Sequence, residues 1–181
     1  MLPLALDLSG RDVLVIGLGR VGRHKACQLL AAGARVHVIS EGLIAEVPAG
    51  VASVQVRAYR PGDLEGYLLV VSATGRGGVN DQIVAEAHQR HVLLNVVDDP
   101  ARCNFYFTSV YRDGDVTVSV SSSGASPSLA QWVRRRVQEM LPPGLGAVAS
   151  TLRAERAELH ARGQSTERDW SRRVEELTRD L

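Results

Sequence analysis

Short apolar runs alternate with amphipathic stretches over the first hundred residues of the chain. Residues 54–57 alternate between apolar and polar side chains, and residues 80–90 place apolar side chains at helical spacing. The longer apolar runs are typical of strands buried on both faces, and they occupy residues 13–16, 35–39, 67–73 and 92–97. This alternation predicts an α/β fold: a Rossmann-type parallel sheet with helices on both faces.

The pattern changes after Pro100 to that of a small β-plus-helix module. Two strand-like runs, at residues 105–111 and 116–120, are joined by a segment with an Asp-Gly pair, which is a strong hairpin-turn signal. An amphipathic helix is expected over residues 127–140, with Ser126 as its N-cap and proline in the first helical position.

Helical spacing continues to the C-terminus. Apolar residues between 145 and 159 recur at helical intervals, and residues 166–169 have the form of a capping box for a last helix. We therefore expect three parts: a Rossmann-type domain over residues 1–112, a smaller β-plus-helix module over 113–144, and a helical C-terminal region over 145–181.

The composition is that of a globular protein without a strong charge bias. Of the 181 residues, 45% are hydrophobic and 23% charged, with a net charge of +1, so nothing indicates a nucleic-acid or membrane partner. Cys27 and Cys103 are far apart, and we expect neither a disulfide framework nor a metal site. The first residues lack the basic segment of a signal peptide and no run is long enough to span a membrane, so we expect a cytoplasmic protein.

The joint between the first predicted strand and the following helix carries the motif G-x-G-x-x-G. Gly17 allows a sharp turn, Gly19 lets the backbone approach a pyrophosphate, and Gly22 lets the helix pack close to the strand. The helix start, where Arg20 and Val21 lie, offers free N–H groups to the phosphates. The motif indicates a dinucleotide site; the alternative is a tight turn that binds nothing.

The end of the second predicted strand bears on which dinucleotide is bound. An acid about 20 residues past the glycines holds the ribose hydroxyls of NAD, whereas an arginine accommodates the 2′-phosphate of NADP. Here Ser40, Glu41 and Gly42 follow the strand with no adjacent arginine, which favours NAD. Alternatively, Glu41 caps a short helix expected over residues 41–47.

Two adjacent acids, Asp98 and Asp99, follow the strand that contains Asn95. The carboxyl edge of an open parallel sheet is where ligands bind, and a partly desolvated carboxylate beside a nicotinamide suits a general base. The alternative is an ordinary turn in which Asp99 precedes Pro100. Spacing alone does not separate Asp98 from Asp99.

A serine-rich segment precedes the helix over residues 127–140. Its hydroxyls and N–H groups, at Ser122, Gly124 and Ser126, suit a carboxylate or phosphate ligand; the alternative is a plain helix cap. Three arginines at residues 134–136 suit an anionic ligand or a solvated helix face.

Taken in order, these segments resemble the precorrin-2 dehydrogenases of siroheme synthesis, including the N-terminal part of multifunctional siroheme synthases. The likeness covers most of residues 1–145. The matching segments are P-L-x-L-D-L at 3–8, the glycine turn with a downstream lysine at 17–25, A-G-A at 32–34, Tyr59 with Asp63 and Leu64, S-A-T at 72–74 with Asn80, N-V-V-D at 95–98, F-Y-F-T-S-V at 105–110 and S-S-G-A-S-P at 122–127.

The resemblance implies a homodimeric enzyme that oxidises the tetrapyrrole precorrin-2 to sirohydrochlorin with NAD. It implies that residues 1–112 form the NAD-binding domain and that residues 113–144 form the dimerisation and substrate module. It implies that Asp98, the acid of N-V-V-D, is the catalytic carboxylate. We assign Thr74 to the cofactor site as well, and to the substrate site we assign Asn95, Ser122, Gly124 and Ser126. A non-catalytic NAD(H)-sensing Rossmann module is the alternative function.

Two questions stay open at the level of the sequence. Some relatives also insert ferrous iron into sirohydrochlorin, and the choice between iron and cobalt, or between the siroheme and cobalamin branches, is not indicated. The chain also departs from the family after Thr74, where an acid is usual and Gly75-Arg76-Gly77-Gly78 stands instead.

Overall fold

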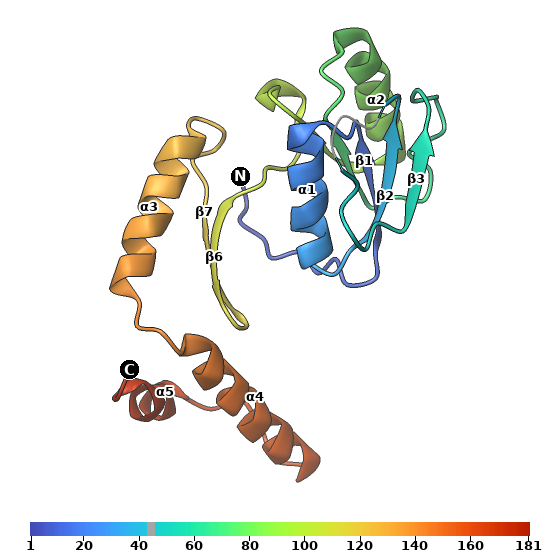
Figure 1. Ribbon diagram of the computed structural model, residues 1–181. Helices are drawn as coiled ribbons and strands as arrows, with labels where there is room; N and C mark the ends of the chain where they lie inside the picture. The colour runs from blue at the N-terminus through green and yellow to red at the C-terminus, as the bar shows by residue number, and fades with distance from the viewer. Residues whose placement is uncertain (43–45) are drawn as a thin grey trace. The chain divides into compact units, whose positions relative to one another are not determined.

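The computed structural model describes residues 1–42 and 46–181, which form two compact units, Met1–Tyr106 and Phe107–Leu181 (Figure 1). The helix expected over residues 41–47 includes residues 43–45, which lie outside the described residues. Among the described residues, no helix has the length and apolar character needed to cross a membrane.

The first unit is a five-stranded sheet in which every strand pairing is parallel. Its strand order is β3-β2-β1-β4-β5, which confirms the predicted Rossmann-type fold. The strands are β1 (Asp12–Ile16), β2 (Arg35–Ser40), β3 (Ser53–Val56), β4 (Leu69–Ser72) and β5 (Leu93–Val96). The helices are α1 (Arg20–Ala31), α2 (Gly77–Arg90) and the short 3-10 helix η1 (Pro100–Arg102).

The two helices cover opposite faces of this sheet. The chain moves from β1 through α1 to β2 in one direction, and from β4 through α2 to β5 in the other, so right-handed crossovers place α1 and α2 on different faces. Leu14 and Ile16 of β1 pack in one core cluster with Ile83 of α2. Side chains alternate along a strand, so Val13 and Val15, which are also buried, face the layer of α1.

The strand order changes direction between β1 and β4. At such a switch point the connections leave the carboxyl ends of the two strands on opposite sides, and a crevice opens between them. Because β1, β2 and β4 are parallel, the loop after β1, the end of β2 and the loop after β4 all lie at this edge. The fold thus positions the glycine turn at the place where open α/β sheets bind ligands.

The second unit begins with an antiparallel hairpin of β6 (Ser109–Asp113) and β7 (Val116–Val120), followed by three helices. These are α3 (Pro127–Met140), α4 (Leu145–Ala161) and α5 (Ser171–Thr178). The strand predicted over 105–111 starts later, at Ser109. The carbonyl of Phe105 accepts a hydrogen bond from Asn95 Nδ2 at 3.0 Å, so Phe105 is bonded within the first unit and not to β7.

The hairpin tip is fastened to the start of α4. The N–H of Gly144 donates to Asp113 Oδ2 at 2.9 Å, and Arg153 pairs with Asp115 at 2.6 Å. The predicted boundary at residue 112 falls inside β6, and the predicted boundary after residue 144 falls at the start of α4. The division of the chain into three parts with different functions stays a prediction.

The predicted capping box at residues 166–169 is wrong. Helix α5 begins at Ser171, and the carbonyl of Thr166 accepts a hydrogen bond from Trp170 Nε1 at 3.2 Å. The Asp169 carboxylate accepts from the Ser171 N–H at 2.8 Å. A local Asx-type bond therefore precedes the last helix, which begins four residues later than the capping box requires.

Candidate cofactor-binding site

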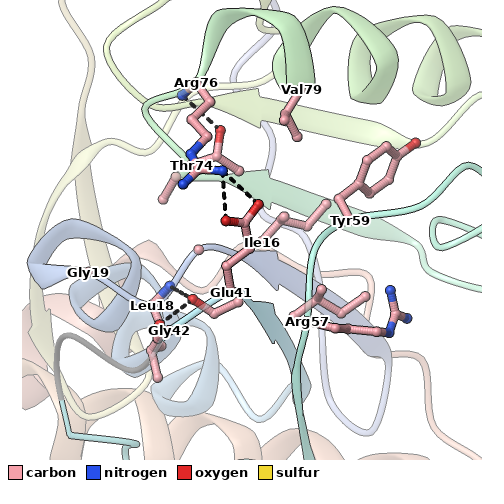
Figure 2. Close-up of a pocket in the computed structure, with 14 residues that line it drawn as sticks. Ile16, Leu18, Gly19, Glu41, Gly42, Arg57, Tyr59, Thr74, Arg76 and Val79 are labelled. Carbon is pink, nitrogen blue, oxygen red and sulfur yellow. Dashed lines mark hydrogen bonds and ion pairs between the residues drawn. The ribbon is translucent and has the colours of Figure 1, made fainter.

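A pocket of about 400 Å³ opens at the carboxyl ends of β1, β2 and β4 (Figure 2). It is lined by the glycine turn after β1, by the residues that follow β2 and β3, and by the connection between β4 and α2. Of the predicted cofactor residues, it brings together Gly17, Gly19, Ser40, Glu41, Gly42 and Thr74.

Two of the motif glycines are required by close backbone packing. Gly17 has φ +93, and a Cβ there would lie 2.5 Å from the carbonyl oxygen of Ala73. A Cβ at Gly22 would lie 2.0 Å from the carbonyl oxygen of Gly17. Because neither position accommodates a side chain, the sharp turn and the close approach of α1 to β1 both depend on glycine.

Gly19 differs from these two because it faces open space. A Cβ built on Gly19 has no neighbouring atom within 4 Å. Gly19 is the N-cap of α1, with no side-chain cap and no acid in the first turn, so in this part of the described chain the N–H groups at the helix start are available to a ligand. Arg20 and Val21 occupy this first turn. A cradle without a Cβ at a helix N-terminus fits a pyrophosphate.

Ser40 fastens the turn to the end of β2. Its hydroxyl accepts a hydrogen bond from the Leu18 N–H at 3.0 Å and donates to the carbonyl of Gly42 at 2.7 Å. Ser40 is buried, with only 7% of its surface exposed to solvent. Ser40 thus supports the pocket wall, and its direct contact with a cofactor stays a prediction.

Glu41 lies opposite Arg76 across the pocket and pairs with it. Nη1 of Arg76 lies 2.8 Å from Oε1 and 2.7 Å from Oε2 of Glu41, as Figure 2 shows. Arg76 is the N-cap of α2. No arginine is adjacent to Glu41 in the sequence, but the fold brings Arg76 of the β4–α2 connection next to it.

Thr74 is the last residue before that connection turns. Its hydroxyl donates to Asn80 Oδ1 at 3.0 Å and accepts from the Arg76 N–H at 3.2 Å. Ser72 donates to the same Asn80 oxygen at 2.7 Å. Thr74 lines the pocket, and its hydroxyl orders the segment that carries Arg76.

Sequence reasoning missed a buried acid behind the pocket wall. Glu86 of α2, 7% exposed, accepts hydrogen bonds from the Tyr59 hydroxyl, the Gly62 and Leu64 N–H groups and Arg90 Nε. Burial acts to raise the pKa of Glu86, but these hydrogen bonds outweigh it and hold the pKa below its ordinary value. Burial and the bond to Glu86 raise the pKa of Tyr59. A charged residue inside an amphipathic helix gave no signal of this role.

Asp98 and Asp99 occupy different environments at the end of β5. Asp98 is exposed and has φ +62, a left-handed conformation that aspartate tolerates better than most residues. Within the described part of the chain, its carboxylate makes no hydrogen bond or ion pair. The Asp99 carboxylate instead pairs with Arg102. Asp98 is therefore the acid whose carboxylate is available at this edge.

Asn95 points its amide toward the chain that leaves β5. Its Nδ2 donates to the carbonyl of Phe105 at 3.0 Å, and the residue is 8% exposed. This hydrogen bond shows that Asn95 stabilises the segment that leaves β5. Its contact with the substrate stays a prediction. Among residues 1–42 and 46–181, no three His, Cys, Asp or Glu side chains are grouped as metal ligands.

The serine-rich segment belongs to the second unit. Ser126 caps α3 by accepting the Leu129 N–H at 3.2 Å, and Ser122 Oγ accepts the Ser126 N–H at 3.0 Å. Gly124, with φ +82, turns the loop between these two serines. The cap interpretation of Ser126 is confirmed, and the predicted ligand contacts of all three residues stay predictions.

This glycine turn, set at the switch point of a parallel sheet with an uncapped helix start, defines a dinucleotide-binding protein of the Rossmann type. Residues 4–109 match the family model described as "Putative NAD(P)-binding". The chain belongs to this NAD(P)-binding family. Residues 113–140 match a second model, described as "Sirohaem biosynthesis protein central".

Similar proteins carry the name siroheme synthase. The chain is 38% identical over 152 residues to the siroheme synthase of Photorhabdus laumondii, an alignment that covers 82% of this chain and 32% of that protein. It is 38% identical over 165 residues to siroheme synthase 1 of Aeromonas salmonicida, covering 89% of this chain and 35% of that protein. The chain thus spans about a third of the length of these relatives.

A solved structure shares the fold. The chain of SirC, a precorrin-2 dehydrogenase, matches with a TM-score of 0.71 and 22% sequence identity, covering 99% of this chain and 88% of that one. The likeness therefore extends beyond the Rossmann sheet to the hairpin and the helices that follow it.

Proposed function

We propose that this chain catalyses the NAD-dependent dehydrogenation of precorrin-2 to sirohydrochlorin, a step toward siroheme or cobalamin. Membership of the NAD(P)-binding family, 38% identity to a siroheme synthase and the fold shared with SirC support the proposal. The observation that carries it is Asp98, an exposed acid after β5 at the same sheet edge as the glycine turn.

The cofactor site of this proposal is the pocket at the β1–α1 turn. The N–H groups at the start of α1 bind the pyrophosphate, Glu41 binds the ribose hydroxyls, and Ser40 and Thr74 order the pocket walls. When bound, NAD supplies the hydride acceptor. The full set of cofactor residues that we propose is Gly17, Gly19, Arg20, Val21, Gly22, Ser40, Glu41, Gly42 and Thr74.

Asp98 is the proposed general base. Oxidation of precorrin-2 removes one hydride and one proton, and the carboxylate of Asp98 takes up the proton. Its exposure lets the proton pass on to water after each turnover. A base needs a carboxylate that is not already paired, and this distinguishes Asp98 from the Arg102-paired Asp99.

The proposed substrate contacts include residues of the second unit. Precorrin-2 carries eight carboxylates, so it suits N–H groups at a helix start and cationic side chains. The segment at the start of α3, with Ser122, Gly124 and Ser126, provides the former. Exposed arginines follow in the same helix, at residues 135 and 136. Asn95 completes the proposed set.

We propose a cytoplasmic homodimer formed through the second unit. Three large apolar side chains of α3, Leu129, Trp132 and Met140, are 53%, 51% and 82% exposed. At 100° per residue, these positions fall on one face of the helix. A second copy of the chain is the partner that we expect on this face, since a homodimer pairs a surface with itself.

The deciding experiment mixes the full chain with precorrin-2 and NAD and follows both the tetrapyrrole chromophore and NADH formation. Conversion to sirohydrochlorin with matching NADH supports the proposal. NADH binding without conversion favours the alternative, an NAD(H)-sensing module. Adding ferrous or cobaltous ion to sirohydrochlorin is a separate assay, which decides whether the chain also acts as a chelatase.

A further inference from the structure

Two arginines line the cofactor pocket, and they differ in how firmly they are held. Arg57 donates from Nη1 and Nη2 to the Asp63 carboxylate at 2.7 and 2.8 Å and from Nε to Gln55 at 2.8 Å. Arg76 is paired with Glu41, and its side chain is 63% exposed against 24% for Arg57. Arg76 is therefore the arginine of this pocket that can exchange its partner for a ligand.

The partner of Arg76 occupies a position that determines cofactor choice. Glu41 follows β2, where an acid binds the ribose hydroxyls of NAD and repels the 2′-phosphate of NADP. An arginine near this position has the opposite preference. Glu41 and Arg76 are 35 residues apart in the sequence, yet they face each other across one pocket (Figure 2).

The backbone of Arg76 is fixed while its side chain is exposed. Its N–H donates to Thr74 Oγ1 at 3.2 Å, and its carbonyl accepts from the Asn80 N–H at 3.0 Å. The guanidinium therefore pivots from an anchored point at the pocket wall. Because an exposed ion pair is held weakly in water, a phosphate or a ribose competes with it effectively.

We propose that the Glu41–Arg76 pair lets this pocket accept NADP as well as NAD. With NAD, Glu41 accepts hydrogen bonds from the ribose hydroxyls. With NADP, the guanidinium of Arg76 binds the 2′-phosphate, and its positive charge offsets the repulsion that Glu41 alone would exert on that phosphate. The inference rests on the proposed function, which makes this pocket the cofactor site.

The test titrates the full chain with NADH and NADPH and follows the fluorescence of the reduced nicotinamide. We expect the two Kd values of the unaltered chain to agree within about tenfold. Arg76→Ala weakens NADPH binding by about tenfold or more and changes NADH binding by less than about threefold. Glu41→Gln weakens NADH and leaves NADPH as tight or tighter. Comparing the Kd of adenosine 2′,5′-bisphosphate with that of 5′-AMP isolates the contribution of the 2′-phosphate to binding.

Arg153→Ala is the matched control. Arg153 is also paired with one carboxylate, that of Asp115, and its side chain is 68% exposed, but it belongs to the second unit. This variant should leave both affinities unchanged. NADPH binding more than about 100-fold weaker than NADH, or a ratio unchanged by Arg76→Ala, overturns the inference while the proposed function stands. Binding of neither nucleotide overturns both.

Discussion

Nε of Arg102 lies 3.1 Å from Oδ2 of Asp99, whereas the carboxylate of the neighbouring Asp98 has no ion-pair partner among residues 1–42 and 46–181. The two residues are adjacent in sequence and both have the right charge for a base. Only their surroundings distinguish them, and the proposed chemistry depends on that distinction.

Asp98→Asn should abolish turnover and preserve NADH binding. Asparagine keeps the side-chain size and tolerates a left-handed backbone, but it takes up no proton, so the rate should fall by about 10²–10⁴-fold. Initial rates with precorrin-2 and an NADH titration measure the two effects. Asp99→Asn serves as the control and should keep most of the activity; the reverse ranking of the two variants would assign the base to Asp99.

Gly22→Ala should damage the fold, and Gly19→Ala should damage binding alone. A Cβ at Gly22 meets the Gly17 carbonyl at 2.0 Å, so we expect a loss of about 2 kcal/mol or more in unfolding free energy. A Cβ at Gly19 meets no protein atom, so stability should hold while NADH binding weakens by at least about tenfold. Thermal unfolding and nucleotide titration measure both. If Gly19→Ala left the affinity for NADH unchanged, the assignment of the pyrophosphate site to this turn would be wrong.

Glu86→Gln should destabilise the first unit and change its response to acid. Glu86 accepts four hydrogen bonds, one of them from Arg90, and an amide matches them poorly, so we expect a loss of about 2 kcal/mol at neutral pH. The folded pKa lies below the ordinary 4.5, so Glu86 contributes stability above that pH and loses it as pH falls through the folded pKa. The difference in unfolding free energy between the unaltered chain and the Glu86→Gln variant should therefore become smaller in acid. Urea unfolding across the acid range measures it, and a constant difference would contradict this account.

Trp132→Glu should weaken the proposed homodimer. A charge in the centre of an apolar contact costs about 2 kcal/mol, or about 30-fold in the dimer Kd. Sedimentation velocity over a dilution series measures the change. Gln131→Glu adds the same charge to an exposed residue on a different face of α3 and should leave the dimer intact. A monomer in the unaltered chain would contradict the proposed assembly.

The sheet was predictable because its strands are buried on both sides. Val13, Leu14, Val15 and Ile16 are all nearly inaccessible, and an unbroken apolar run is the pattern that such burial produces. The hairpin was predictable from Asp113 and Gly114 for a similarly local reason, a turn whose backbone favours glycine. Most elements of the fold could therefore be predicted from local sequence patterns.

The pairings of the site were not predictable, because they join residues that are far apart in the sequence. Glu41 follows β2 and Arg76 follows β4, the two strands that flank β1 in the sheet, and no local pattern links them. Ser40 illustrates the same limit: its position indicated a cofactor contact, whereas its hydroxyl holds the Leu18 N–H. The long-range bond from Asn95 Nδ2 to the Phe105 carbonyl was likewise not predictable from local sequence.

The left-handed backbone of Asp98 also restricts which acids can serve there. A φ of +62 lies in the left-handed region, where aspartate and asparagine are several-fold enriched and glutamate is not. Glutamate would also carry its carboxylate one methylene farther from the turn. The two acids are therefore not interchangeable at this position, and the reach of the proposed base is set by the main chain that presents it.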